Sequence, residues 1–347
     1  MSAQRLFRRH DAASQAKYQD VKQLARAQAR VLSGTPGTLK HRIQNSKRYW
    51  VREYIRVDGR KVDDYVGAET SVGEARIATL RAEMDLAKGL ASGSSTLRVL
   101  GFQRIERKAA AVLAAFFNRG LFHAGLTLVG SHAYGVLLNE LGAIAPGYRT
   151  LDVDVARAQP LAIALPGGTT FKQLLGESEL EFVAVPGMPS HRPSSSFKLP
   201  GRESLAVDLL VPGKNAGAVV AVKELETHAQ TIPFLEFLVD EAMEGIVLSP
   251  NQVIPVSVPT PERFALHKLF SSQSRKANRD KLRKDLEQAA VLAAIVEEET
   301  PGRIGDAFRK VPAAGKPAMK RGARAAARLL QDVHPEAEEV LRRFAGK

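Results

Sequence analysis

Three segments decide the fold of this chain: LVGSHAYGVLLNELG (Leu128–Gly142), TLDVDVA (Thr150–Ala156) and LAVDLLV (Leu205–Val211). The first begins as a short apolar strand and turns at Gly130–Ser131 into a helix. The other two are apolar strands interrupted by aspartates. A strand, a helix and two further strands in this order predict an α/β core.

The second segment carries two aspartates, Asp152 and Asp154, two residues apart. Residues i and i+2 of a strand point to the same face, roughly 6–7 Å apart. Two carboxylates on a buried face repel each other and are costly to desolvate, and a divalent cation removes that cost. Oxygen ligands suit Mg²⁺ or Mn²⁺. The alternative is an edge strand whose aspartates face water.

A third aspartate, Asp208, lies in the apolar third segment, where a carboxylate has no packing role. Three aspartates from two strands could hold two metal ions. Asp208 could also act as the base that activates an acceptor hydroxyl. The alternative is a buried polar residue with satisfied hydrogen bonds.

Gly130 and Ser131 join a strand to a helix start. Glycine lets the backbone approach a ligand closely, and a helix N-terminus favours an anion. Ser131 is therefore a candidate for donating a hydrogen bond to a phosphate, or for the N-cap of the helix. The alternative is an ordinary capped strand–helix turn.

Composition excludes several classes of protein. The 347 residues include no cysteine, which excludes disulfide scaffolds, thiol catalysis and Cys-ligated zinc, and fits a reducing cytoplasm. The longest apolar run, Ala109–Phe117, is far shorter than the roughly 20 residues that span a bilayer, so no membrane association is expected. The fingerprints G-x-x-x-x-G-K-[ST], G-x-G-x-x-G and H-E-x-x-H are absent, which argues against P-loop, dinucleotide-binding and zincin sites.

Positive charge is concentrated at both ends of the chain. Residues 1–60 contain 14 Lys and Arg against 4 Asp and Glu, a net charge of +10. Residues 301–347 carry +6, and the middle carries −3. This distribution suits a partner with phosphates, such as nucleic acid. The alternative is a solvated basic surface.

The pattern predicts three domains: a basic helix–hairpin–helix module over residues 1–95, a core over 96–260 and a helical region over 261–347. In the first, the Asp58-Gly59 pair predicts a hairpin, and a Gly/Ser-rich break at Ala91–Ser95 marks its end. Phe234–Val239 is predicted to be a strand, and Pro261 the first residue of a helix capped by Thr260. The predicted helices are Asp11–Leu32, Ser71–Ala91, Phe102–Asn118, Ser131–Leu141, Pro261–Ser272, Lys276–Glu298, Pro301–Arg309, Lys316–Asp332 and Pro335–Phe344.

The three segments together resemble the nucleotidyltransferase superfamily, which has the DNA polymerase β-like fold. This resemblance implies an α+β fold with a mixed sheet flanked by helices. The shared pattern is an apolar strand with Gly-Ser, a helix, Asp-x-Asp, and a later strand with a third acidic residue. The long spacing between Ser131 and Asp152, and the form T-x-D-x-D, resemble a bacterial nucleotidyltransferase-like branch. That branch also carries a segment similar to Gly37–Gly67, and the resemblance covers residues 35–290.

A second resemblance covers Pro261–Ala289, which is similar to an element of abortive-infection-type nucleotidyltransferase toxins. It implies that Lys268 contacts the nucleotide triphosphate and that Lys284 and Asp285 lie near the site. Gln288 stands where those families have a second aspartate. Surface lysines on an amphipathic helix are the alternative.

One strand of the predicted hairpin alternates aromatic and basic residues: Arg48, Tyr49, Trp50, Arg52, Tyr54 and Arg56. Such a surface can stack on bases and bind phosphates. In the alternative, the aromatics cover a small core while the arginines face water.

The leading hypothesis is therefore a metal-dependent nucleotidyltransferase. Asp152, Asp154 and Asp208 would hold Mg²⁺ or Mn²⁺, and Gly130, Ser131, Lys268, Lys284 and Asp285 would bind the NTP donor. The acceptor hydroxyl could belong to RNA or tRNA, a protein or a small molecule, and a toxin-like role would imply an antitoxin partner. The competing hypotheses are a non-catalytic nucleic-acid-binding protein on the same fold and a hydrolase that uses the same metal ligands.

Overall fold

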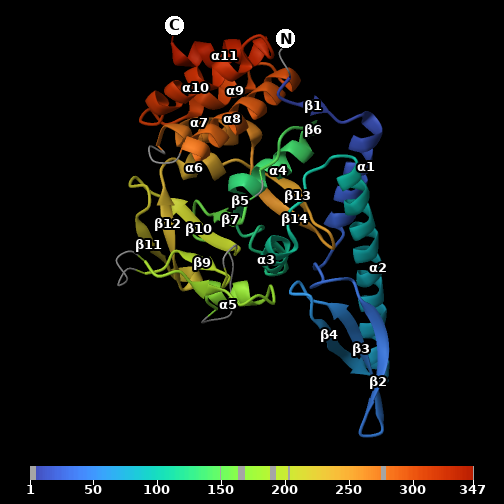
Figure 1. The fold of residues 1–347 in the computed structure, drawn as a ribbon. Coiled ribbons are helices and arrows are strands. Elements are labelled where there is room, and N and C mark those ends of the chain that lie inside the picture. The colour runs from blue at the N-terminus through green and yellow to red at the C-terminus, as the bar shows by residue number, and fades with distance from the viewer. Residues whose placement is uncertain are drawn as a thin grey trace.

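The computed structural model describes residues 5–148, 150–162, 169–187, 193–201, 204–274 and 279–346. It confirms an α+β protein with a central mixed sheet, helices on its faces and a smaller antiparallel sheet at one side (Figure 1).

The central sheet has its main strands in the order β11-β12-β10-β7-β5, with β9 beside β10 and β8 beside β9. β7 and β12 run parallel to β10, whereas β9 is antiparallel to it, as are β5 to β7 and β11 to β12. The strands are β5 (Thr127–Val129), β7 (Asp152–Ala156), β8 (Val183–Ala184), β9 (Ser196–Lys198), β10 (Ala206–Pro212), β11 (Val219–Val222) and β12 (Thr227–Ile232).

Alternation along β7 and β10 sorts the side chains between two faces. Val153, Val155, Val207 and Leu209 are fully buried in the main core, while the aspartates of the same strands point the other way. The α-helices of this core are α3 (Arg107–Asn118), α4 (Gly130–Glu140), α5 (Phe171–Gly176) and α6 (Leu235–Val239). A 3₁₀ helix, η1 (Lys223–Leu225), connects β11 to β12.

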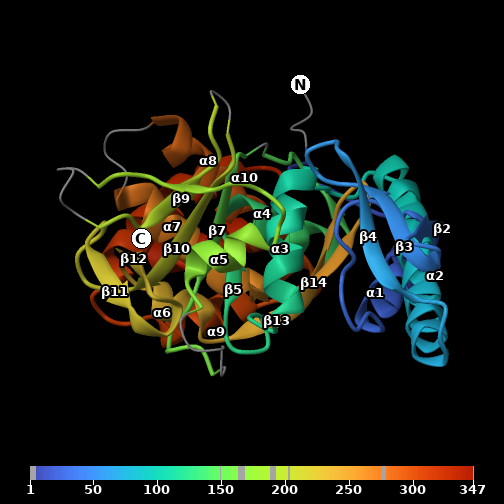
Figure 2. The same cartoon turned by 90° about the horizontal axis from the view of Figure 1, so that it is seen from below.

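The N-terminal part lies on the side of the molecule opposite β11 (Figure 2). Its sheet has the antiparallel order β2-β3-β4, and the long helix α2 packs against β4 and against α1. The elements are α1 (Ala12–Arg26), β2 (Thr38–Gln44), β3 (Lys47–Ile55), β4 (Lys61–Ala68) and α2 (Ser71–Val99). The short strands β1 (Arg8–Arg9) and β6 (Ala143–Ile144) pair with each other.

The C-terminal helices gather at one end of the core (Figure 1), and α7 packs against both α8 and α10. They are α7 (Pro261–Ser274), α8 (Arg279–Glu299), α9 (Arg303–Lys310), α10 (Lys316–Leu330) and α11 (Pro335–Ala345). A hairpin of β13 (Ala242–Leu248) and β14 (Val253–Pro259) precedes them. No helix among the described residues is both long and apolar enough to cross a membrane.

Two local predictions were wrong. Phe234–Val239 is not a strand, because Leu235–Val239 forms α6. The expected break at Ala91–Ser95 lies inside α2, which continues to Val99. There Gly93 contacts α1 so closely that a Cβ on it would lie 2.6 Å from Val21 Cγ2. Tertiary packing thus outweighs weak helix propensity, and the domain boundaries at residues 95 and 260 stay a prediction.

The N-terminal part is joined to the core by a buried ion pair. Lys22 Nζ of α1 lies 2.6 Å from Glu140 Oε2 of α4, and the Tyr18 hydroxyl donates to Glu140 Oε1 at 2.7 Å. Both charged side chains are less than a tenth exposed. Burial and the Glu140 charge raise the pKa of Tyr18 well above its ordinary value, so its hydroxyl keeps its proton.

Lys22→Met should destabilise the protein by about 3–5 kcal/mol, because it leaves the Glu140 carboxylate buried without its cation. Urea denaturation followed by circular dichroism measures the change. Lys17→Met, an exposed position of the same helix, is the control and should change stability by less than about 0.5 kcal/mol. Equal shifts for the two variants would contradict this role of the ion pair.

Candidate active site

One cavity of about 380 Å³ brings together seven of the eight residues predicted for the site. They come from the β5–α4 junction, from β7 and β10, and from the helices α7 and α8. These seven are Gly130, Ser131, Asp152, Asp154, Asp208, Lys268 and Lys284.

The aspartates meet because β7 and β10 pair in parallel with Asp154 directly opposite Asp208. Asp152 lies two residues before Asp154 on the same face. Burial, together with the negative charge of Asp152, raises the pKa of Asp208 above its ordinary value. A hydrogen bond with Ser196 and the positive charge of Lys281 oppose that rise. The carboxylates therefore interact electrostatically across the cavity.

The donor chemistry of these carboxylates fits a hard divalent cation. The three carboxylates are not yet close enough together to coordinate an ion. Within the described ranges, no group of three His, Asp or Glu side chains is arranged to hold a metal. Closure of the three side chains on a cation would relieve their mutual repulsion.

Gly130 allows helix α4 to begin against Asp154. Its φ is +67°, and a Cβ at this position would overlap Asp154 Oδ2. The N-cap of α4 is Val129, which makes no side-chain capping hydrogen bond. Of the two roles considered for Ser131, the N-cap is therefore excluded, because Ser131 lies within the first turn. Backbone N–H groups at the start of α4 have no intrahelical partner and are suited to an anion.

Lys268 extends from α7 and is held by Asp285 of α8. Its Nζ lies 2.7 Å from Asp285 Oδ1 and 5.3 Å from the ring centre of Phe264. Asp285 is 2% exposed and lies behind Lys268 instead of at the cavity surface. Asp285 therefore contacts Lys268 and does not line the cavity, and its predicted contact with a nucleotide stays a prediction.

The cavity is similarly basic on its α8 side. Lys284 Nζ lies 5.1 Å from the ring centre of Tyr148, whose hydroxyl donates to Glu287 at 2.6 Å. Lys281, which the sequence pattern did not separate from a solvated helical face, lines the same cavity.

An apolar region that the sequence did not predict completes the lining: Ile232, Pro233, Leu235, Leu238, Phe264 and Phe270. Leu235 and Leu238 were not expected to line the cavity, because Phe234–Val239 was predicted to be a strand. The helical spacing of Phe264 and Lys268, one turn apart on α7, was the available signal for the part of this region on α7.

A family model described as "Nucleotidyltransferase" matches residues 107–313. The chain belongs to this nucleotidyltransferase family. It is therefore an enzyme that transfers nucleotidyl groups, and the superfamily prediction is confirmed. Comparisons with curated proteins and with solved structures gave no match. The matched segment of this nucleotidyltransferase includes every residue predicted for the site, whereas α1, the β2-β3-β4 sheet and α2 lie outside it.

In this nucleotidyltransferase His132 follows Ser131 but is packed inside. It is 7% exposed, and its Nε2 has no hydrogen-bond partner among the described residues. Burial, with the nearby charge of Lys284, lowers the pKa of His132 to about 4. The imidazole is therefore neutral at pH 7.

Gly130→Ala should reduce NTP affinity at least about tenfold, because the added methyl group displaces Asp154 and strains the φ of +67°. Isothermal titration calorimetry measures the affinity. Gly125→Ala is the control, since Gly125 also has positive φ but a Cβ there has open space. If both variants lose NTP affinity equally, the close approach of Gly130 to Asp154 has no role in binding.

The His132 pKa predicts a pH dependence of stability. Above about pH 6.5 neither the folded nor the unfolded state binds the proton, and the full stability is present. As the pH falls towards 4 the unfolded chain takes up a proton that the folded chain excludes, so about 3 kcal/mol is lost. His132→Gln should remove this component from the pH profile of urea denaturation, and exposed His123→Gln should leave it. An unchanged profile in His132→Gln would contradict the assignment.

Proposed function

We propose that this nucleotidyltransferase moves an NMP group from an NTP to an acceptor hydroxyl in the cavity described above, with Mg²⁺ or Mn²⁺. The observation that carries the proposal is the placement of three carboxylates, a helix N-terminus and three lysines in that single cavity. Such a set can bind a triphosphate and balance charge that develops during phosphoryl-type transfer.

The triphosphate binds between the sheet and the C-terminal helices in this proposal. Its β- and γ-phosphates accept hydrogen bonds from backbone N–H groups at Gly130 and Ser131, and Lys268 neutralises their charge. Because Lys268 is clamped by Asp285 and packed against Phe264, little side-chain entropy is lost when the phosphate binds. The apolar region around Leu235 and Phe270 takes the base.

The aspartates are the proposed ligands of the divalent cation, which when bound supplies charge neutralisation and orientation. The acceptor oxygen attacks the α-phosphorus while the bond to the β-phosphate oxygen breaks, and pyrophosphate leaves. Asp208 lies opposite Asp154 in the same cavity, and in this proposal its carboxylate also assists removal of the hydroxyl proton. Catalysis arises mainly from positioning and charge balance.

The acceptor classes proposed from the sequence are RNA or tRNA, a protein and a small molecule. The basic N-terminal region, with its net charge of +10, favours RNA. A toxin-like role with an antitoxin partner and a cytoplasmic location stay predictions.

Transfer can be measured with the four α-³²P-labelled NTPs, Mg²⁺ or Mn²⁺, total tRNA and cell lysate. Wild-type protein should label RNA or protein, and Asp152→Asn/Asp154→Asn should reduce the label at least about 10³-fold, since it removes two ligands of the cation. Asp85→Asn, an exposed carboxylate of α2, is the control and should label as wild type does.

The readouts separate the alternatives. Label on a small molecule, seen by thin-layer chromatography, would identify that acceptor class. Release of free NMP without transfer would establish the hydrolase instead. Equal activity in Asp152→Asn/Asp154→Asn and wild type would refute the proposed site.

A further inference from the structure

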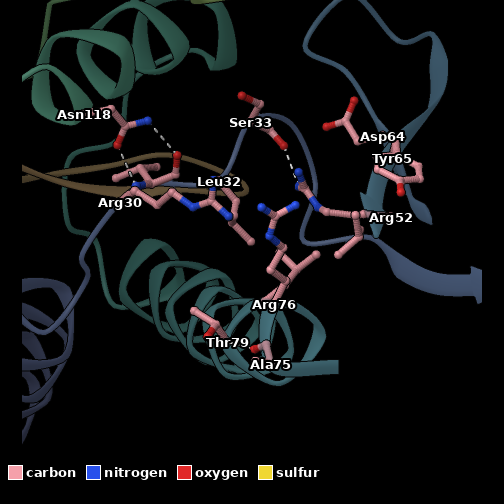
Figure 3. A pocket seen from close by; sticks show the side chains of 13 residues that line it. Arg30, Leu32, Ser33, Arg52, Asp64, Tyr65, Ala75, Arg76, Thr79 and Asn118 are labelled. Atoms are coloured by element: carbon pink, nitrogen blue, oxygen red, sulfur yellow. Dashed lines mark hydrogen bonds between the residues drawn. The ribbon is translucent and has the colours of Figure 1, made fainter. Parts of the chain in front are cut away.

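A second, larger cavity of about 530 Å³ lies in the N-terminal part, outside the segment that matches the family model. It is formed by the chain after α1, by β3 and β4, and by α2, with Asn118 of α3 at one side (Figure 3). It shares no lining residue with the cavity that holds the aspartates. Three of its lining residues are arginines: Arg30, Arg52 and Arg76.

Arg52 is a fixed charge in this cavity. It is 4% exposed, and its Nη2 donates to the carbonyl oxygens of Ser33 at 2.7 Å and Thr35 at 2.6 Å, while Nε donates to that of Pro36 at 3.0 Å. It forms no ion pair with any described carboxylate. Arg52 therefore does not fit the alternative in which the arginines of this strand face water. Burial lowers its pKa, and the charge of Arg30 lowers it further.

The other two arginines approach the same space. Figure 3 shows the guanidinium ends of Arg30 and Arg76 directed towards that of Arg52. Arg30 is paired with Glu83 at 2.7 Å. Arg76 is exposed, and among the described residues it has no hydrogen-bond or ion-pair partner. Of the described lining residues one, Asp64, carries a carboxylate. Like charges gathered in this way are stabilised by an anion.

An exposed aromatic side chain lies at the same cavity. Tyr65 is 64% exposed, and its ring centre lies 5.8 Å from that of Tyr49. Arginines for phosphate and an exposed aromatic face for bases are the two components of a surface that binds a nucleic-acid strand.

We propose that this arginine cavity binds the phosphodiester backbone of a nucleic acid, with Arg76 at a phosphate, the buried charge of Arg52 adding to the attraction, and Tyr65 stacking on a base. That the bound strand is also the acceptor rests on the proposed function. The two cavities share no lining residue. A ligand held at Arg76 can therefore place a hydroxyl near Asp208 only if it extends beyond the arginine cavity, as a nucleic-acid strand does. A small phosphorylated acceptor would occupy one cavity alone.

The test uses the full-length protein and a 5′-fluorescent single-stranded RNA 20-mer, with DNA of the same sequence as a second arm. Binding is measured by fluorescence anisotropy at several salt concentrations, without NTP. Arg76→Gln should weaken binding about tenfold and reduce the slope of log K against log salt by about 1. Tyr65→Ala should weaken it about fivefold.

The matched control is Arg98→Gln, which removes the same charge from an exposed position of α2 outside the cavity. It should change affinity less than twofold. Equal losses in Arg76→Gln and Arg98→Gln, or no loss in either, would overturn the proposal. If the protein binds the RNA but not the DNA, the ligand of the cavity is RNA. If it binds both, the cavity recognises the phosphodiester backbone that they share.

The outcome is independent of catalysis. Asp152→Asn/Asp154→Asn should bind the RNA as wild type does, because neither aspartate lines the arginine cavity. If this variant binds but wild type transfers nothing, the proposed function fails while the nucleic-acid site stands. If wild type transfers label but Arg76→Gln binds and transfers normally, the site fails while the proposed function stands.

Discussion

The parallel pairing of β7 with β10 is the constraint on which the rest of the structure depends. It places Asp154 opposite Asp208, and it sends the valines and leucine of the same strands into the core on the other face. A shift of one residue would exchange the two faces, burying carboxylates and exposing apolar side chains. Burial of those apolar residues therefore fixes the position of the acids, and stability and chemistry are specified by the same register.

The wall of the active-site cavity that faces the aspartates consists of helices instead of strands. Its lysines come from α7 and α8, and the buried contact of Lys268 with Asp285 holds the two helices together at that point. Buried ion pairs cost desolvation free energy and contribute mainly to a unique geometry. The sheet thus supplies anionic groups and the helices cationic ones, and a triphosphate with its cation has complementary charge to both.

The sequence was most informative where one residue type has one physical explanation. Aspartates in apolar strands and a glycine before a helix have few structural uses, so Asp152, Asp154, Asp208 and Gly130 could be predicted to share a site. The Phe234–Val239 run was misinterpreted because a short apolar run does not distinguish a buried helix from a strand. The Gly/Ser-rich part of α2 was misinterpreted because its contact with Val21 is invisible to local propensity. Arg30, Arg52 and Arg76 lie more than twenty residues apart, so only the tertiary fold brings them together.

The order of the cavity's components along the chain has a consequence for biosynthesis. The last of its aspartates is residue 208, and the first of its lysines is residue 268. Since domains tend to fold from the N-terminus as the ribosome releases them, the acidic face emerges about sixty residues before any lysine that balances it. Because Lys284 lies on α8, the complete cavity exists only when α8 has left the ribosome.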